Sequence, residues 1–224
     1  VDGVLELYGA DLPQTQITRI FSVGLLGQER RRRLVPTEWS ITAVDDILGR
    51  SLYKRVLRFP WIGNYSIFGH AALGNNVQVL LLPSSYMFEA LEAWLTSANP
   101  VPASDHEYEY GRSQYAHNLE GAYYAVRLPV LEYLSGASRQ AGAVVFLEVY
   151  PEWIPLGVWR FREICRRALA KQPIETNNLR DALDVLKSKL RLPLEHWLRQ
   201  SSILKYHRNQ TRITSFLERD LKAH

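Results

Sequence analysis

Positively charged side chains gather beside hydroxyl groups and a tryptophan near residue 35. Arginines occupy positions 30–33, and the segment that follows contains Thr37, Trp39 and Ser40. A guanidinium can hold a phosphate through two hydrogen bonds, hydroxyl groups can donate to the same phosphate, and a base can stack on an indole ring. The segment favours contact with DNA or a nucleotide; a solvated loop, with Trp39 packed in the core, is the alternative. The predicted nucleic-acid-binding residues are Arg31, Arg32, Arg33, Thr37, Trp39, Ser40 and Arg127.

A second group of side chains could support metal or acid–base chemistry. His117, Glu120, Tyr124 and Arg127 are spaced so that, within one helix, they share a face. Carboxylates elsewhere could add the oxygen ligands that a nuclease needs for a magnesium ion, so a divalent metal ion is the cofactor of this alternative. Its predicted catalytic residues are Asp45, Asp46, His117, Glu120 and Glu148. Structural roles compete with this interpretation: Asp45 as a helix cap, Glu148 as the ion-pair partner of an arginine, and the helix face as solvated surface.

The C-terminal end carries a short apolar pattern. In a single helical turn Ile213, Phe216 and Leu217 converge on one face, with Gln210 preceding them. Such a face can enter a groove on a partner, or it can dock on its own domain. The spacing resembles the peptide by which replication and repair proteins bind the sliding clamp PCNA. That resemblance implies that Gln210 fills a polar side pocket and the apolar trio enters a cleft, with Leu217 where a second aromatic residue is commonest.

Composition excludes several classes of protein. The chain has 224 residues, of which 46% are hydrophobic and 22% are charged, so it can bury a sizeable core. No apolar run is long enough to span a membrane, and the single cysteine excludes an internal disulfide. P-loop, dinucleotide-binding and nucleophile-elbow glycine patterns are absent, which argues against ATP-driven or acyl-transfer chemistry. A net charge of +4 and the lack of a signal peptide are typical of a cytoplasmic protein and compatible with a nucleic-acid partner.

The patterning predicts a mixed α/β fold with a central β-sheet flanked by helices, a helical C-terminal third and an extended tail. We expect one domain over residues 1–200 and a tail with the clamp-binding motif over residues 201–224. Residues 143–150 are almost continuously β-branched or aromatic, as in a central strand covered on both faces. Residues 66–73 and 77–82 predict a hairpin around a Gly-Asn-Asn turn.

Helical periodicity recurs in several segments. A capping box of Thr42 and Asp45 predicts a helix from there to about residue 58. Pro129 should kink or split the helix expected over residues 115–134. The stripe that contains Cys165 places this thiol in the core. The other expected segments are a short strand or edge element within residues 1–27, a loop at 99–105, and helices at 86–96, 157–170, 177–189 and 193–200.

Three blocks of sequence resemble the archaeal Nre family, whose members are implicated in DNA repair. They are residues 32–46, 117–127 and 155–163. Glu38 departs from the family, where a basic residue is often found. The resemblance implies a DNA repair or damage-response factor that binds PCNA through its tail, and residues 30–46 are expected to hold DNA or a nucleotide. It implies no catalytic activity, so a metal-dependent nuclease or phosphohydrolase and a pure protein scaffold remain as alternatives.

Overall fold

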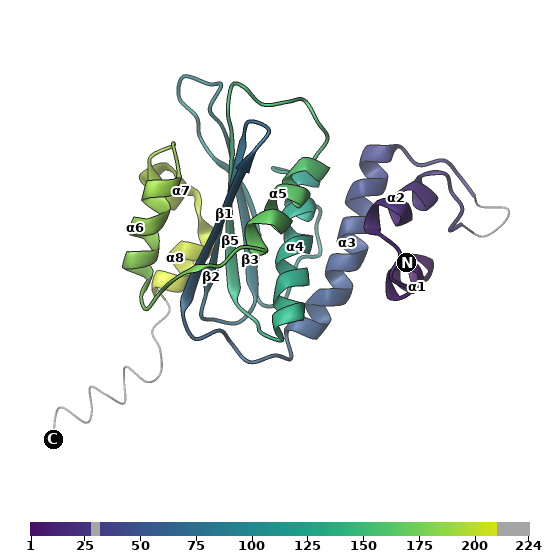
Figure 1. Cartoon of the computed structure of the whole chain (residues 1–224), viewed down its shortest axis with the longest axis horizontal. Coiled ribbons are helices and arrows are strands. Elements are labelled where there is room, and N and C mark those ends of the chain that lie inside the picture. Colours follow the sequence, from purple (N-terminus) through teal and green to yellow (C-terminus); the bar gives the residue numbers. More distant parts are fainter. Residues whose placement is uncertain (28–31, 210–224) are drawn as a thin grey trace.

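A six-stranded β-sheet lies at the centre of the computed structural model, which describes residues 1–27 and 32–209 (Figure 1). The strand order is β4-β3-β5-β2-β1-β6. The strands are β1 (Tyr65–Ala72), β2 (Asn75–Leu82), β3 (Met87–Trp94), β4 (Ala103–Glu107), β5 (Gly142–Val149) and β6 (Ile174–Thr176). The mixed α/β prediction is confirmed, and so is the central position of β5, whose residues are all buried.

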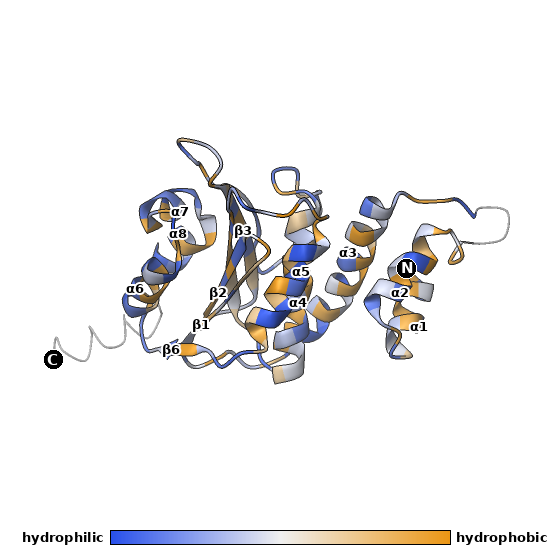
Figure 2. Ribbon diagram, turned by 45° about the horizontal axis from the view of Figure 1, so that its top comes forward, coloured by the Kyte–Doolittle hydropathy of each residue, from blue (hydrophilic) through white to orange (hydrophobic). Residues whose placement is uncertain are grey.

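Helices cover both faces of the sheet. The helices of the described residues are α1 (Asp2–Gly9), α2 (Gln14–Ser22), α3 (Thr37–Val56), α4 (Gly121–Ala137), α5 (Trp159–Leu169), α6 (Leu179–Lys189), α7 (Leu194–Gln200) and α8 (Ser202–Asn209). One face packs on α4 and α5, with α3 and then the α1–α2 pair outside them, while α6, α7 and α8 cover the other face (Figures 1 and 2). No helix among the described residues combines the length and apolar content needed to cross a bilayer.

Several local predictions are confirmed. Strands β1 and β2 form the expected antiparallel hairpin, and α5, α6 and α7 lie where the periodicity placed them. The Cys165 side chain is fully buried, and burial raises the pKa of its thiol. An apolar stripe of helical period and a continuous β-branched run were therefore sufficient signals where the neighbouring elements agreed with them.

Other local predictions are wrong. Residues 1–27 form α1 and α2 rather than a strand, and residues 87–94 form strand β3 rather than a helix. Strand β3 pairs in parallel with β5 and antiparallel with β4, which occupies part of the segment expected to be a loop. A short apolar run fits either a buried helix or a buried strand, and here the available pairing edge of β5 decided the outcome.

The start of α3 also differs from the prediction. The helix begins at Thr37, after Pro36, so residue 42 lies within it and forms no capping box. The Thr42 hydroxyl donates to the Glu38 carbonyl one turn earlier, at 3.2 Å. Helix α4 begins at Gly121 and is continuous through Pro129, so the predicted split is absent. As a result, Asp45 lies inside α3 and not in its first turn, and Glu120 lies before α4 and not within it.

The folded body continues beyond residue 200. Helix α8 buries Ile203 and Leu204 against the sheet. The Glu89 carboxylate accepts hydrogen bonds from the backbone amides of Ser202 and Ile203 and so caps the start of this helix. The predicted clamp motif, Gln210, Ile213, Phe216 and Leu217, lies outside the described residues.

Candidate functional site

A groove lies where α3 meets the start of α4 and the loop that precedes it. Its volume is about 680 Å³, within the range of about 300–1,000 Å³ typical of small-molecule sites. We call it the α3–α4 groove. It is lined by Trp39, Thr42, Ala43, Asp46, Arg50, Ser113, Tyr115, Glu120 and Tyr124.

Helix α3 supplies one wall of the groove. From Trp39 to Asp46 to Arg50, the lining residues recur at helical spacing and therefore share one face. The Trp39 side chain is 66% exposed, so packing in the core, the alternative from the sequence, is wrong. The Asp46 carboxylate and the Arg50 guanidinium form an ion pair of 2.8 Å along the helix, which orients the arginine on this wall of the groove.

Tyrosines form the opposite wall. The rings of Tyr115 and Tyr124 stack with a centroid separation of 5.4 Å and an interplanar angle of 29°. Tyr115 remains 43% exposed, and its other neighbour, the His117 ring, lies edge-on at 5.3 Å. Burial raises the pKa of both phenols, so they stay protonated at neutral pH. The groove therefore offers flat aromatic surfaces and one accessible cation.

A small chamber lies against the groove and shares Asp46, Arg50 and Tyr124 with it. Its volume of about 20 Å³ has room for about one water molecule. The Arg127 guanidinium forms two hydrogen bonds with the Glu107 carboxylate, at 2.6 and 3.3 Å, and both side chains are buried. Among the described residues, Arg127 Nη1 and Tyr123 Oη are buried without a hydrogen-bond partner.

Glu120 has an unusual backbone conformation at the rim of the groove. It precedes α4 as the N-cap, with φ of 49° and ψ of −128°. A residue with a side chain pays about 1–3 kcal/mol for such a conformation, and such residues cluster at functional sites. Asp11, Leu73 and Ser138 also have positive φ, and of these four residues Glu120 is the one that lines the groove.

The structure brings three of the predicted site residues together. Trp39, Asp46 and Glu120 line the groove, and Arg127 lies in the chamber beside it. The prediction that four residues share one helical face is wrong. His117 and Glu120 precede α4, and only Tyr124 and Arg127 belong to it. His117 nevertheless reaches the groove indirectly, through its ring contact with Tyr115.

Asp45 points away from the groove, although it adjoins Asp46 in sequence. Both oxygens of its carboxylate accept hydrogen bonds from Arg162 Nη1, at 2.7 and 2.8 Å. One of them, Oδ1, also accepts from Gln14 Nε2 at 2.7 Å. Burial raises the pKa of Asp45 to about 7, and the Arg162 guanidinium opposes this shift. Asp45 thus links α2, α3 and α5 and does not cap a helix.

Glu148 lies elsewhere, fully buried on β5. Its carboxylate accepts from Asn76 Nδ2 at 2.9 Å, from the Tyr150 hydroxyl at 2.7 Å and from the Leu192 amide at 2.8 Å. These neutral donors replace the arginine that the sequence suggested. Within residues 1–27 and 32–209, no three histidine, cysteine, aspartate or glutamate side chains are close enough to hold a metal ion together.

The predicted phosphate-binding segment does not line the groove apart from Trp39. Arg32 Nε donates to the Gly27 carbonyl at 3.2 Å, and Arg33 is exposed. The Ser40 hydroxyl is buried and donates to the Val35 and Pro36 carbonyls. Thr37 lies exposed in the first turn of α3, and Arg31 lies outside the described residues.

Sequence reasoning missed Arg50 and Tyr115. The helical spacing of Trp39, Asp46 and Arg50 is visible in the sequence once α3 is started at Thr37. The contribution of Tyr115 depends on the path of the loop before α4, for which no sequence pattern was available. The signal for Arg50 was present, whereas the signal for Tyr115 was not.

Comparison with known proteins gives consistent matches. The chain is 35% identical over 218 residues to DNA repair protein NreB of Archaeoglobus fulgidus, covering 94% of this chain and 55% of that protein. It is 36% identical over 188 residues to DNA repair protein NreA of the same organism, covering 81% and 48%. DNA repair protein NreA of Haloferax volcanii is 37% identical over 206 residues, covering 88% and 49%.

The chain therefore spans about half the length of these curated relatives. No solved structure matches it. The family model described as Archaeal Nre, N-terminal, matches residues 1–99, and the model described as Archaeal Nre, C-terminal, matches residues 107–216. Together these matches cover most of the chain and include the elements that form the groove, which shows that the chain belongs to the archaeal Nre family.

Proposed function

We propose that this chain takes part in DNA repair in the cytoplasm and that the α3–α4 groove holds a nucleotide of DNA. The observation that carries the proposal is that the exposed Trp39 ring, the stacked Tyr115 and Tyr124 rings and the Arg50 side chain line one groove. The names of the relatives, all DNA repair proteins, support the same role.

Each part of the groove suits a different part of a nucleotide. Aromatic rings bind bases irrespective of sequence, and a stacked base contributes about 1–3 kcal/mol. The Arg50 side chain is 60% exposed and can reach a phosphate while Asp46 orients it. Stacking requires the base to leave its own helix, so single-stranded or distorted DNA is the preferred substrate.

The test is the affinity for a single-stranded oligonucleotide, measured by fluorescence anisotropy. We expect Trp39→Ala to weaken binding by about tenfold, which is the loss of one stacked base. Trp61→Ala is the matched control, because Trp61 is 56% exposed and does not line the groove. Equal affinities for wild type and Trp39→Ala would show that the groove does not bind DNA.

A metal-dependent nuclease or phosphohydrolase is the second candidate function. Asp46 and Glu120 both line the groove. The strained backbone of Glu120 favours a functional role for this residue over that of an ordinary surface carboxylate. Carboxylate oxygens at a nucleotide site can bind a divalent metal ion. Magnesium-dependent cleavage of a labelled oligonucleotide that is lost in Asp46→Asn or Glu120→Gln, with affinity retained, would favour the enzyme over the DNA-binding adaptor.

We also propose that the C-terminal segment binds the sliding clamp PCNA through Gln210, Ile213, Phe216 and Leu217. The spacing of these residues supports the proposal. Replacement of an aromatic anchor in a partner's pocket costs about 2 kcal/mol or more, so Phe216→Ala should weaken clamp binding at least about tenfold in calorimetric titrations. Leu221→Ala, outside the spacing, is the control, and unchanged affinity of Phe216→Ala would refute the motif.

A further inference from the structure

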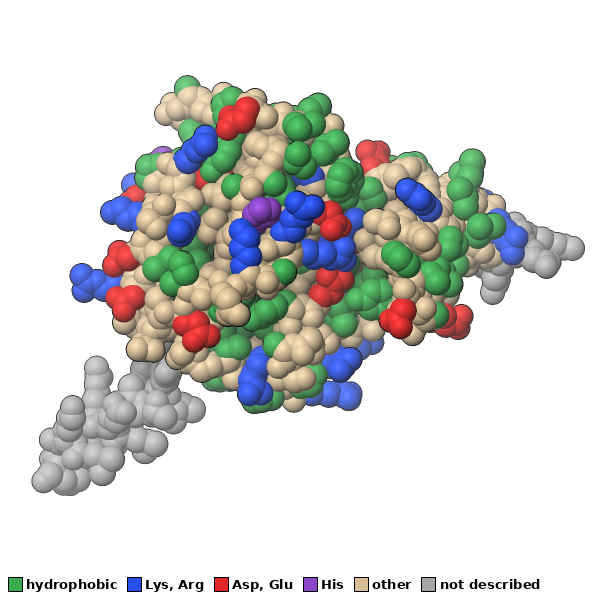
Figure 3. Space-filling view, in the orientation of Figure 1, with side chains coloured by type: hydrophobic (Ala, Val, Ile, Leu, Met, Phe, Trp, Pro, Cys, Tyr) green, Lys and Arg blue, Asp and Glu red, His purple; other side chains and the backbone are tan. Residues whose placement is uncertain are grey.

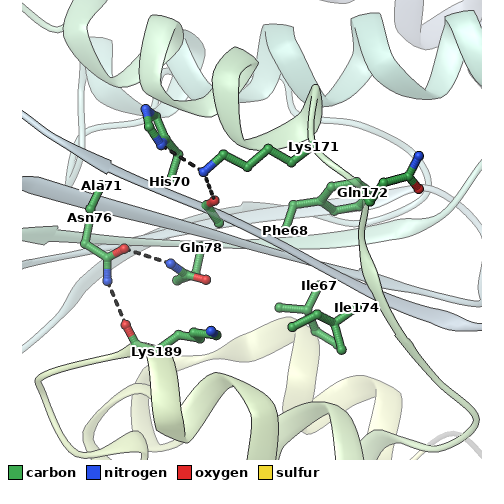
Figure 4. Close-up of a pocket in the computed structure, with 11 residues that line it drawn as sticks. Ile67, Phe68, His70, Ala71, Asn76, Gln78, Lys171, Gln172, Ile174 and Lys189 are labelled. Carbon is green, nitrogen blue, oxygen red and sulfur yellow. Dashed lines mark hydrogen bonds between the residues drawn. The ribbon is translucent and has the colours of Figure 1, made fainter.

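A second pocket lies at the open edge of strand β1, between the end of α5 and the end of α6 (Figure 4). We call it the β1-edge pocket. Its volume is about 240 Å³. The side chains with hydrogen-bonding groups that line it are His70, Asn76, Gln78, Lys171, Gln172 and Lys189. None of the residues described on its walls is an aspartate or a glutamate.

The topology leaves this edge open. Strand β6 pairs with β1 only from Tyr65 to Ile67, and the rest of β1 has no strand beside it on that side among the described residues. Lys171 Nζ donates to the Gly69 carbonyl at 3.1 Å, so this carbonyl faces the pocket edge and not β2. The Lys171 side chain therefore occupies the position where a further strand would otherwise pair with β1.

The cations around the pocket have no acidic partners in the part of the chain that the structure describes. Lys171, Lys189 and the nearby Arg167 form no ion pair within the described residues. Burial together with the charges of Lys171 and Arg167 lowers the pKa of His70, which indicates a positive local potential. On the face drawn in Figure 3, lysine and arginine side chains lie near a histidine, with acidic side chains close by.

His70 presents a donor as well. Its Nδ1 lies 3.0 Å from Lys171 Nζ, and because an ammonium group can only donate, Nδ1 accepts and the ring proton resides on Nε2. The lowered pKa keeps the ring neutral at physiological pH, so this arrangement persists. The Lys171 ammonium and the His70 ring are thus held in a fixed relation in the lining of the pocket.

An amide network forms the floor. Gln78 Nε2 donates to Asn76 Oδ1 at 2.7 Å, and Asn76 Nδ2 donates to the Lys189 carbonyl at 2.9 Å (Figure 4). A Cβ at position 69 would lie 2.2 Å from Gln78 Oε1, so the glycine is what allows this buried amide to lie across β1. The floor is therefore preorganised and links the two lysine-bearing walls.

We propose that the β1-edge pocket binds a phosphate group. Two lysines and a histidine line this recess (Figure 4), none of its described lining residues is a carboxylate, and ammonium and imidazole N–H groups donate charge-assisted hydrogen bonds to phosphate oxygens. The site is independent of the α3–α4 groove, since the two share no lining residue. The phosphate belongs either to a small ligand or to the backbone of DNA.

The experiment uses the full chain and inorganic phosphate, titrated by isothermal calorimetry at low ionic strength. We expect saturable binding to wild type. The double variant Lys171→Gln with Lys189→Gln should bind phosphate about tenfold more weakly, because it loses charge-assisted hydrogen bonds. Lys187→Gln is the matched control, because Lys187 is an exposed lysine on α6, the helix of Lys189, and does not line the pocket. Absent binding, or equal binding by the double variant, overturns the proposal.

Two further measurements complete the test. In wild type, phosphate should shift the imidazole resonances of His70 and leave those of His196 unchanged; the reverse result would place the anion elsewhere and overturn the assignment. Single-strand DNA affinity of the double variant then identifies the source of the phosphate. A reduced salt dependence means the DNA backbone, whereas unchanged DNA binding with lost phosphate binding means a small ligand.

Discussion

The α3–α4 groove and the β1-edge pocket use cations in opposite ways. Every arginine of the groove and its chamber has a carboxylate partner, whereas the lysines of the pocket have none within the described residues. The three pairs are Arg50 with Asp46, Arg112 with Asp105, and Arg127 with Glu107. Paired charges attract a distant anion weakly, so aromatic surface must supply most of the affinity of the groove. Unpaired charges make the pocket selective for anions.

Burial explains the difference for Arg127. Arg127 is 5% exposed, and a buried guanidinium is tolerated only with its hydrogen bonds largely satisfied by a fixed partner. Lys171 and Lys189 are exposed, so water solvates them when no ligand is bound. Arg127 and the two lysines therefore differ in both partner and exposure, whereas Arg50 combines a carboxylate partner with an exposed side chain.

The largest expected effect concerns stability. Arg127→Met leaves the Glu107 carboxylate buried without its partner, which should lower the free energy of unfolding by about 3–5 kcal/mol. Lys171→Met removes an exposed charge and should change it by less than about 0.5 kcal/mol. Urea denaturation followed by circular dichroism measures both. Equal stabilities would remove the distinction between the two regions.

A double variant sharpens that result. Adding Glu107→Gln to Arg127→Met removes the stranded charge, so the pair of changes should cost less than the sum of the two single changes. Strict additivity would mean that the 2.6 Å contact between these side chains contributes little.

A smaller effect is expected at two glycines that make room for polar side chains. A Cβ at Gly49 would lie 2.7 Å from Arg127 Nη1, and Arg127 is held by Glu107 and cannot move aside. Gly49→Ala should therefore destabilise the fold by about 1–3 kcal/mol, despite the better helix propensity of alanine. At Gly69 the obstacle is the Gln78 amide, which can rotate away. Gly69→Ala should therefore lower the free energy of unfolding by about 1 kcal/mol, because the hydrogen bond from Gln78 to Asn76 is lost.

Thermal unfolding of both variants decides this point. Phosphate titration separates them further, because only Gly69→Ala disturbs the floor of the β1-edge pocket. Should Gly49→Ala prove as stable as wild type, the tight packing of α3 on Arg127 would be dispensable.

The smallest expected effect is on the salt dependence of DNA binding. Trp39→Ala should lower affinity equally at all salt concentrations, since stacking releases no counterions. Loss of one lysine–phosphate contact reduces the logarithmic salt slope by about 0.7 for single strands, so Lys171→Gln should flatten the plot if the pocket contacts the DNA backbone. Anisotropy at several salt concentrations measures both slopes, and a flattened slope in Trp39→Ala would contradict the assignment of this residue to stacking.

Much of the fold could be predicted because some segments satisfy only one structure. The β-branched run of β5 has the pattern of a strand buried on both faces, and the amphipathic stripe of α5 has a single apolar side. Trp39 belonged to the predicted site because its indole ring lies close in sequence to the arginines at positions 30–33 and to hydroxyl side chains. The membership in the Nre family rests on local strings of residues and was also visible at this level.

Tertiary structure decided the rest. Strand β3 has an ambiguous apolar pattern, which the neighbouring edge of β5 resolved. Asp45 and Asp46 are chemically identical and adjacent, yet one is buried against Arg162 and the other lines the groove, because α3 turns them to different sides. Which carboxylate meets which arginine depends on contacts between residues far apart in the chain, such as Glu107 with Arg127. Sequence thus determined the local elements and the aromatic and basic side chains available, and only the packing of those elements decided which charges are neutralised and which stay free for a ligand.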